Sequence, residues 1–240
     1  MNLAWIPNSI TMGNLLFGFL SIIFASKGDY QFAGLAILFA VLLDGLDGQV
    51  ARILKVSSPL GAELDSLADC VTFGVAPGYI AYAGFLPHLP LDILGRAVEM
   101  NIFIAAVYPM CAAYRLARFN VDHSQTSFSG LPSPIARVIV ALVAIAFPNL
   151  DDLKYYSVIL IPAYVITGLL MVSTVKFSKP QVFILNKIHG IQLLILLLII
   201  IALGIVVRKY ILLILIGLIA LYIVAGLIMM IIQFIQDNKY

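Results

Sequence analysis

Apolar residues run in long stretches along this chain, and only short polar segments separate them. A helix needs about 20 apolar residues to cross the hydrocarbon core of a bilayer, and the stretches are of about that length. Segments such as Lys27-Gly28-Asp29 and Arg208-Lys209-Tyr210 leave room only for tight turns between antiparallel helices. The pattern predicts an all-α fold, a polytopic integral membrane bundle of about eight transmembrane helices. The predicted spans are residues 10–25, 31–54, 60–86, 97–119, 132–147, 155–175, 191–207 and 211–234.

Composition supports a membrane location and excludes a water-soluble globule. The 240 residues are 62% hydrophobic and 11% charged, whereas about a quarter of the residues of a soluble domain are charged. About eight spans with short loops use up the whole chain, so residues 1–240 are expected to form a single membrane domain. Fourteen Lys and Arg against twelve Asp and Glu give a net charge of +2, which provides no strongly basic face for nucleic acid.

The distribution of basic residues predicts the orientation of the bundle. With the N-terminus in the cytoplasm, nine basic residues fall on the inner side and five on the outer side, in keeping with the positive-inside rule. The inner residues are Arg52, Lys55, Arg115, Arg118, Arg137, Lys176, Lys179, Lys187 and Lys239. The outer residues are Lys27, Arg96, Lys154, Arg208 and Lys209. We therefore expect a protein of the cytoplasmic membrane with both ends inside the cell.

Acidic residues break the apolar pattern of the second and third predicted spans. Asp44, Asp47, Glu63, Asp65 and Asp69 are five of the twelve acids of the chain, and they fall within 26 residues. An acid at the centre of a membrane helix costs about 2.5 to 3.5 kcal/mol. Four unpaired aspartates would therefore cost about 10 kcal/mol, which is comparable to the whole stability of many domains. These side chains must have partners.

Helical geometry brings the four aspartates together. If the two helices turn at residues 55–59, a rise of 1.5 Å per residue places all four in one layer near the inner surface. Asp44 and Asp47 are three residues apart and Asp65 and Asp69 four apart, so each pair shares a helical face. Carboxylates that converge in a dry layer repel one another unless cations lie among them, and hard oxygen ligands suit Mg²⁺, Mn²⁺ or Ca²⁺. We expect a pair of divalent cations, as in phosphoryl-transfer sites.

Small residues lie on the same two faces. Gly48 and Ala51 extend the first face and Gly61 extends the second, which leaves room for a ligand against the backbone. Two other uses of the acids stay open. They can pair with arginines, namely Arg52, Arg115, Arg118 and Arg137, or they can form the ion path of a cation transporter. The single acidic layer, the space at the glycines and the lack of an inverted repeat favour a ligand-binding enzyme over a transporter.

The acidic segment spells Asp44-x2-Asp47-Gly48-x2-Ala51-Arg52-x8-Gly61-x3-Asp65-x3-Asp69. It resembles the signature of the CDP-alcohol phosphatidyltransferase family at every defined position and spacing. Members of that family are mostly helical, usually dimeric membrane enzymes whose motif bridges the second and third membrane helices. The resemblance implies a catalytic core of about residues 1–175 with six helices, followed by two additional C-terminal helices at 190–236. It also implies a homodimer, for which Gly74-x3-Gly78 is a weak signal because small residues permit close helix packing.

The resemblance also implies roles for individual residues. Asp44, Asp47 and Asp65 would bind the Mg²⁺ or Mn²⁺ ions, with Ca²⁺ able to substitute. Asp69 would lie at the metal site and act as the base for the acceptor hydroxyl. The residues implied to bind the nucleotide or the CDP-lipid are Asn8, Thr11, Gly48, Ala51, Arg52 and Gly61.

Three further stretches resemble the phosphatidylserine synthase branch of the family. They are Phe73-Gly74-Val75-Ala76-Pro77, Tyr114-Arg115-Leu116-Ala117-Arg118-Phe119-Asn120 and Gly130-Leu131-Pro132-Ser133-Pro134. The early Ile6-Pro7-Asn8, with Thr11 and Asn14, also fits, so the match covers about the first 140 residues. Enzymes of this branch transfer a phosphatidyl group from CDP-diacylglycerol to L-serine and release CMP. Acceptors such as glycerol 3-phosphate or inositol phosphate, and an archaeal ether-linked donor lipid, stay open as alternatives.

Two groups of polar residues have a structural and a functional interpretation. Arg115 and Arg118 are three residues apart, so their planar guanidinium groups can reach one pocket and hold the carboxylate of serine or a phosphate. They can equally anchor a helix end at the membrane surface. Asn8, Thr11 and Asn14 recur every three residues and either face the nucleotide or mark the interfacial start of a helix.

Overall fold

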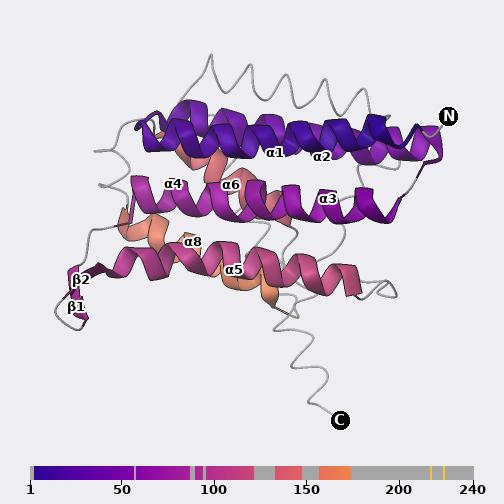
Figure 1. Ribbon diagram of the computed structural model, residues 1–240. Coiled ribbons are helices and arrows are strands. Elements are labelled where there is room, and N and C mark those ends of the chain that lie inside the picture. Colours follow the sequence, from indigo (N-terminus) through magenta and orange to yellow (C-terminus); the bar gives the residue numbers. More distant parts are fainter. Residues whose placement is uncertain are drawn as a thin grey trace, which may run out of the picture.

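The computed structural model describes residues 3–56, 58–86, 90–93, 96–121, 133–147 and 157–173, with the single positions Gly217 and Val224. This part of the chain is mostly helical (Figure 1). The helices are α1 (Trp5–Ser26), α2 (Tyr30–Leu54), α3 (Pro59–Asp69), the π-helix η1 (Cys70–Val75), α4 (Ala76–Gly84), α5 (Met100–Val121), α6 (Ser133–Ala146) and α8 (Ser157–Val172). The spans predicted at 191–207 and 211–234 lie outside the described residues, apart from those two positions.

Three of the described helices are long and apolar enough to cross a membrane, namely α1, α2 and α5. They coincide with the spans predicted at 10–25, 31–54 and 97–119. The spans predicted at 132–147 and 155–175 correspond to α6 and α8, which are shorter. The mostly helical prediction is therefore confirmed for the described residues, and the total of about eight spans stays a prediction.

The connection between α1 and α2 is tight, as the sequence predicted. Gly28 takes a φ of +77°, a left-handed conformation that glycine adopts without a side-chain clash. Asp29 then caps α2, because its side-chain oxygen accepts a hydrogen bond from the backbone N–H of Phe32 at 3.3 Å. The two helices consequently lie side by side along most of their length (Figure 1).

The third predicted span is continuous from Pro59 to Gly84, but it changes its helical form at the centre. Residues Cys70–Val75 form a π-helix, in which the N–H of Ala76 donates to the carbonyl of Val71, five residues back. Pro77 explains the change, because its nitrogen carries no proton to donate to the carbonyl of Phe73 in an α-helix. The wider turn begins directly after Asp69 and rotates the following residues relative to the acidic face.

A short β-hairpin lies within the otherwise helical described part and corrects the start of the span predicted at 97–119. Strands β1 (Pro90–Ile93) and β2 (Arg96–Glu99) pair antiparallel, with Leu91 opposite Val98 and Ile93 opposite Arg96. They connect α4 to α5 at one end of the bundle (Figure 1). The physical reason is local: Asp92 alternates with Leu91 and Ile93 in the first strand, and only residues 94 and 95 separate the strands, as in tight hairpins. The predicted span from residue 97 therefore begins as a helix only at Met100.

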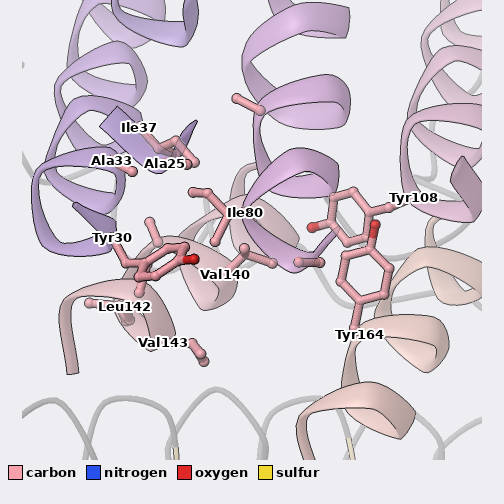
Figure 2. Packing of buried hydrophobic residues seen from close by; sticks show 14 of the residues in the cluster. Ala25, Tyr30, Ala33, Ile37, Ile80, Tyr108, Val140, Leu142, Val143 and Tyr164 are labelled. Carbon is pink, nitrogen blue, oxygen red and sulfur yellow. The ribbon is translucent and has the colours of Figure 1, made fainter. Parts of the chain in front are cut away.

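The apolar core lies between the hairpin of α1 and α2 and the remaining helices. Ile37 from α2, Ile80 from α4 and Tyr108 from α5 are fully buried and contribute to it, as Figure 2 shows. Two buried tyrosines, Tyr30 and Tyr164, hydrogen-bond their hydroxyl groups to neighbouring backbones. Tyr30 Oη donates to the Ala83 carbonyl at 2.7 Å, and Tyr164 Oη donates to the Ala105 carbonyl at 2.7 Å.

Glycines allow the closest helix contacts. A Cβ at Gly74 would lie 3.1 Å from Ala112 Cβ, and one at Gly78 would lie 3.2 Å from Pro109 Cδ, so both glycines pack on α5 of the same chain. The Gly74-x3-Gly78 pair therefore serves packing within the chain, which removes it as a signal for a dimer. At Gly34 a Cβ would lie 2.5 Å from the carbonyl oxygen of Ala141 in α6.

We predict that Gly34→Leu destabilises the protein by forcing α2 and α6 apart. Overpacking of this kind costs about 1 to 3 kcal/mol, and a lower unfolding temperature in detergent should report it. Gly45→Leu is the matched control on the same helix, because Gly45 is exposed and a Cβ there has nothing within 4 Å among the described residues. Equal unfolding temperatures for the two variants would contradict the packing described at Gly34.

Candidate active site

Carboxylates from two helices converge near one end of the bundle. Asp44 and Asp47 lie on α2 and Asp65 lies on α3, and one carboxylate oxygen from each lies within 4.8 Å of the others. Asp47 is the most buried of the three, with 6% of its surface exposed. The predicted meeting of the two acidic pairs is thus found for three of the four aspartates.

The turn between α2 and α3 aims the two acidic faces at each other. Lys55 ends α2 in the left-handed conformation with a φ of +52°, and the N–H of Val56 returns to the carbonyl of Ala51 at 3.0 Å. Ser58 then caps α3, since its hydroxyl oxygen accepts a hydrogen bond from the N–H of Gly61 at 3.0 Å. Pro59 follows at the first helical position, where its missing N–H costs nothing.

Helix α1 packs against both α2 and α3 and supplies polar partners to the acids. Thr11 Oγ1 donates a hydrogen bond to Asp47 Oδ2 at 2.7 Å. One turn along the same face, Asn14 Nδ2 donates to Asp69 Oδ1 at 3.2 Å. Both donors are buried, Thr11 with 4% and Asn14 with 0% of the side chain exposed. Asp47 and Asp69 are therefore held from the same helix.

A cavity of about 200 Å³ opens between these helices beside the acids. Five of the six residues predicted to bind the nucleotide or lipid line it: Asn8, Thr11, Gly48, Ala51 and Gly61. The other lining residues are Ala4, Pro7, Asp47, Val56, Ser58, Ala62 and Asp65. The cavity is open enough for part of a nucleotide-sized ligand and brings that ligand against Asp47 and Asp65.

The two glycines of this cavity differ in their surroundings. A Cβ at Gly48 would have nothing within 4 Å among the described residues, so it faces open space. A Cβ at Gly61 would lie 2.9 Å from Asn8 Oδ1 and 3.1 Å from Ser58 Oγ. Gly48 therefore leaves room for a ligand, whereas Gly61 chiefly lets the start of α3 approach α1.

The arginines lie away from this lining. Arg52 is exposed, and its Nε donates to the Gly48 carbonyl at 3.0 Å, one turn back on α2. Arg118 Nη1 donates to the carbonyl of Val172 at the end of α8, at 3.2 Å. Arg115 is half-buried on the same helix end as Arg118. Among the described residues, none of these three arginines lines the cavity beside the acids.

Two contacts of the site go beyond what the sequence predicted. Asn14 contacts Asp69, although the sequence offered only its place in a polar stripe with Asn8 and Thr11. Asn120 Nδ2 donates to Ser66 Oγ at 2.8 Å and ties the end of α5 to α3 beside Asp65. The polar stripe on an otherwise apolar helix was the available signal for the first contact, and we find no comparable signal for the second.

The donor set fits hard divalent cations. All three converging ligands are carboxylates, which Mg²⁺, Mn²⁺ and Ca²⁺ prefer and which a structural zinc site rarely uses alone. Asp47 has one oxygen hydrogen-bonded to Thr11, which leaves its other oxygen for a metal ion. Asp44, Asp47 and Asp65 could therefore hold a metal, with Asp69 one helical turn beyond Asp65.

Known proteins are similar in sequence to this chain. The family model of the CDP-alcohol phosphatidyltransferases matches residues 4–175. A CDP-diacylglycerol–serine O-phosphatidyltransferase of Helicobacter pylori is 35% identical over 182 residues, which cover 72% of this chain and 71% of that protein. The protein of the same name from Bacillus subtilis is 37% identical over 174 residues, covering 72% of this chain and 89% of the relative. One from Methanocaldococcus jannaschii is 35% identical over 174 residues, covering 72% and 74%.

The family match spans the acidic motif, the cavity and all the described helices from α1 to α8. It agrees with the resemblance drawn from the motif between Asp44 and Asp69 and confirms it. The chain belongs to the CDP-alcohol phosphatidyltransferase family.

Proposed function

We propose that this protein transfers a phosphatidyl group from CDP-diacylglycerol to the hydroxyl of L-serine, giving phosphatidylserine and CMP. The observation that carries the proposal is the convergence of Asp44, Asp47 and Asp65 beside a cavity of about 200 Å³. The relatives with 35 to 37% identity described above carry the name of this activity, which supports serine as the acceptor.

In this proposal Asp44, Asp47 and Asp65 hold a pair of divalent cations, Mg²⁺ or Mn²⁺, with Asp69 at the edge of the site and Ca²⁺ as a substitute in binding. When bound, the cations would supply positive charge to the diphosphate and to the departing CMP. The cavity residues Asn8, Thr11, Gly48, Ala51 and Gly61 would surround the nucleotide end of the CDP-lipid. Arg52 lies outside the lining, one turn beyond Gly48 on α2, and would contact the ligand from there.

Asp69 takes the proton of the acceptor. The hydroxyl of serine is a poor nucleophile at neutral pH, so a carboxylate within reach accepts its proton as the oxygen bonds to the β-phosphorus. The bond from that phosphorus to the bridging oxygen breaks in the same step, and CMP leaves with the electron pair. Arg115 and Arg118 are proposed to hold the carboxylate of serine or a lipid phosphate through their planar donor groups.

The proposal includes the wider setting of the site. The whole chain is a single membrane domain of about eight spans, with a core of about residues 1–175 and two C-terminal helices at 190–236. It works as a homodimer in the cytoplasmic membrane with the site facing the cytoplasm. Three apolar helices in the described part support a membrane enzyme, and the basic residues on the inner side support the orientation.

The acceptor and donor are tested directly. Purified protein in detergent is given CDP-diacylglycerol and Mn²⁺ with each labelled alcohol in turn, and CMP release is followed. We expect serine alone to be incorporated into lipid. Incorporation of glycerol 3-phosphate or inositol phosphate instead would assign a sister enzyme, and an ether-linked CDP-lipid run in parallel tests whether the donor is archaeal in type.

We predict that Asp65→Asn abolishes CMP release while the protein still inserts and folds. Removing one of the converging carboxylates weakens the cation site, and a change at a metal ligand or its supporting partner costs about 10-fold or more in affinity. Mn²⁺ binding and turnover are measured on the same preparation. Near-normal turnover with unchanged sensitivity to chelator would show that Asp65 is not a metal ligand.

We predict that Gly48→Leu weakens CDP-lipid binding, because the added side chain enters the open cavity. Gly45→Leu is the matched control on the same helix: a Cβ there also has nothing within 4 Å, but Gly45 is not among the cavity residues. Binding of a CDP-lipid to both variants, measured by calorimetry, separates the two positions. Unaltered affinity in Gly48→Leu would place the nucleotide elsewhere.

We predict a single displacement at phosphorus with Asp69 as the base. Serine hydroxyls that donate hydrogen bonds in the described residues do so to backbone carbonyls rather than to a base, so a covalent phosphatidyl-enzyme is not expected. A CDP-lipid with chiral β-phosphorus should therefore give product of inverted configuration, and retention would exclude direct transfer. Asp69→Asn should bind the CDP-lipid but turn over about 100-fold or more slowly, and wild-type kcat would exclude it as the base.

A further inference from the structure

The geometry points to Asn14 as a positioning residue that orients the Asp69 carboxylate to receive the acceptor proton. The inference rests on the proposed function, because it assigns Asn14 a task in the same proton transfer. Its structural basis is the hydrogen bond from Asn14 Nδ2 to Asp69 Oδ1 at 3.2 Å, which joins α1 to the end of α3.

This hydrogen bond makes the two oxygens of Asp69 unlike. Oδ1 accepts from the amide of Asn14, and this contact sets the rotation of the carboxylate. A carboxylate on a helix can otherwise rotate about its terminal torsion, which is broad in energy. Fixing that rotation keeps the basic oxygen in one place and lowers the cost of reaching the geometry for proton transfer.

The backbone of α1 is held tightly where Asn14 lies. Thr72 Oγ1 donates to the Ala68 carbonyl at 2.9 Å and lies 3.4 Å from the carbonyl oxygen of Asn14. Gly18 permits this approach, since a Cβ there would lie 2.6 Å from Thr72 Oγ1. The π-helix begins at Cys70, directly after Asp69. Asn14 and Asp69 therefore face each other from two backbones in close contact.

The energetic cost of burying Asn14 also argues that this residue has a functional role. Its side chain is fully buried, and Oδ1 has no hydrogen-bond partner among the described residues. A buried acceptor left without a partner costs about 1 to 3 kcal/mol, so an apolar side chain of similar volume would serve packing better. The hydrogen bond to Asp69 is charge-assisted and offsets part of this cost. Asn14 is therefore better explained by what it does to Asp69 than by stability.

Thr11 provides the comparison within the same helix. It donates to Asp47 Oδ2 at 2.7 Å, three residues before Asn14, and Asp47 is one of the three converging carboxylates. If each donor acts through the acid that it contacts, removing the Thr11 hydroxyl weakens metal binding. Removing the Asn14 amide slows the chemical step instead. Metal affinity and kcat can both be measured without a structure of the site with metal and substrate bound.

The experiment compares Asn14→Leu with Thr11→Val, each removing one donor at similar volume. Mn²⁺ affinity is measured by titration of free Mn²⁺ with electron paramagnetic resonance, and kcat and KM are measured for both substrates. We expect Asn14→Leu to lower kcat about tenfold or more, with KM for the CDP-lipid and Mn²⁺ affinity within about twofold of wild type. We expect Thr11→Val to weaken Mn²⁺ binding about tenfold.

A fall in Mn²⁺ affinity in Asn14→Leu as large as that in Thr11→Val would overturn the inference, since Asn14 would then support a metal ligand. An unchanged kcat with a lowered unfolding temperature would overturn it as well, by showing a packing role alone. If the Leu variant does not fold, Asn14→Ala replaces it with the same expected kcat loss. Wild-type turnover with serine tests the proposed reaction separately, and the variants are compared on whichever alcohol the wild type accepts.

Discussion

The desolvation of acidic side chains inside a membrane is the constraint on which this structure depends. A carboxylate within a membrane-spanning helix costs up to about 3 kcal/mol unless polar or charged partners surround it. The chain meets this cost by bringing Asp44, Asp47 and Asp65 within 4.8 Å of one another, where a divalent cation can compensate their charge. Hydrogen bonds from α1 to Asp47 and Asp69 supply further compensation, so the same arrangement that makes the acids tolerable also makes them a candidate active site.

Helix α1 has a larger part in this arrangement than its apolar sequence suggests. It packs on both acidic helices, to which it presents Thr11 and Asn14, and it presents Gly18 to the π-helix η1. The small residue allows close contact at Thr72, and the two polar residues exploit that contact by reaching the acids. The π-helix at Cys70–Val75 contains Thr72, so the contact with α1 continues into it, and its wider turn rotates the apolar half of the helix relative to the acidic face. Packing and chemistry are thereby assigned to successive segments of one continuous helix.

The sequence predicted those features that depend on spacing alone. The spans of α1, α2 and α5, the meeting of the acids and most of the cavity lining follow from helical periodicity and the position of one turn. The hairpin at 90–99 and the π-helix were missed, because each depends on a short local feature. The hairpin depends on two short strands separated by two residues, and the π-helix depends on one proline that has no N–H to donate. Side-chain partners such as Asn120 with Ser66 were missed because they join segments 54 residues apart.

The hydrogen bond between Asn120 and Ser66 suggests how an active site common to the family could select one acceptor alcohol. In the proposed reaction the three carboxylates and the cavity would bind the donor, so they would serve any acceptor equally. To select one alcohol, the protein must contact the part of the acceptor that differs between alcohols. Arg115 and Arg118 at the charged end of α5 are the residues proposed for that contact. The hydrogen bond of 2.8 Å from Asn120 to Ser66, next to Asp65, fixes this end of α5 against the acidic helix. Arg118 Nη1 donates in turn to the carbonyl of Val172. If the arginines hold the acceptor as proposed, α5 and α8 would together fix their position.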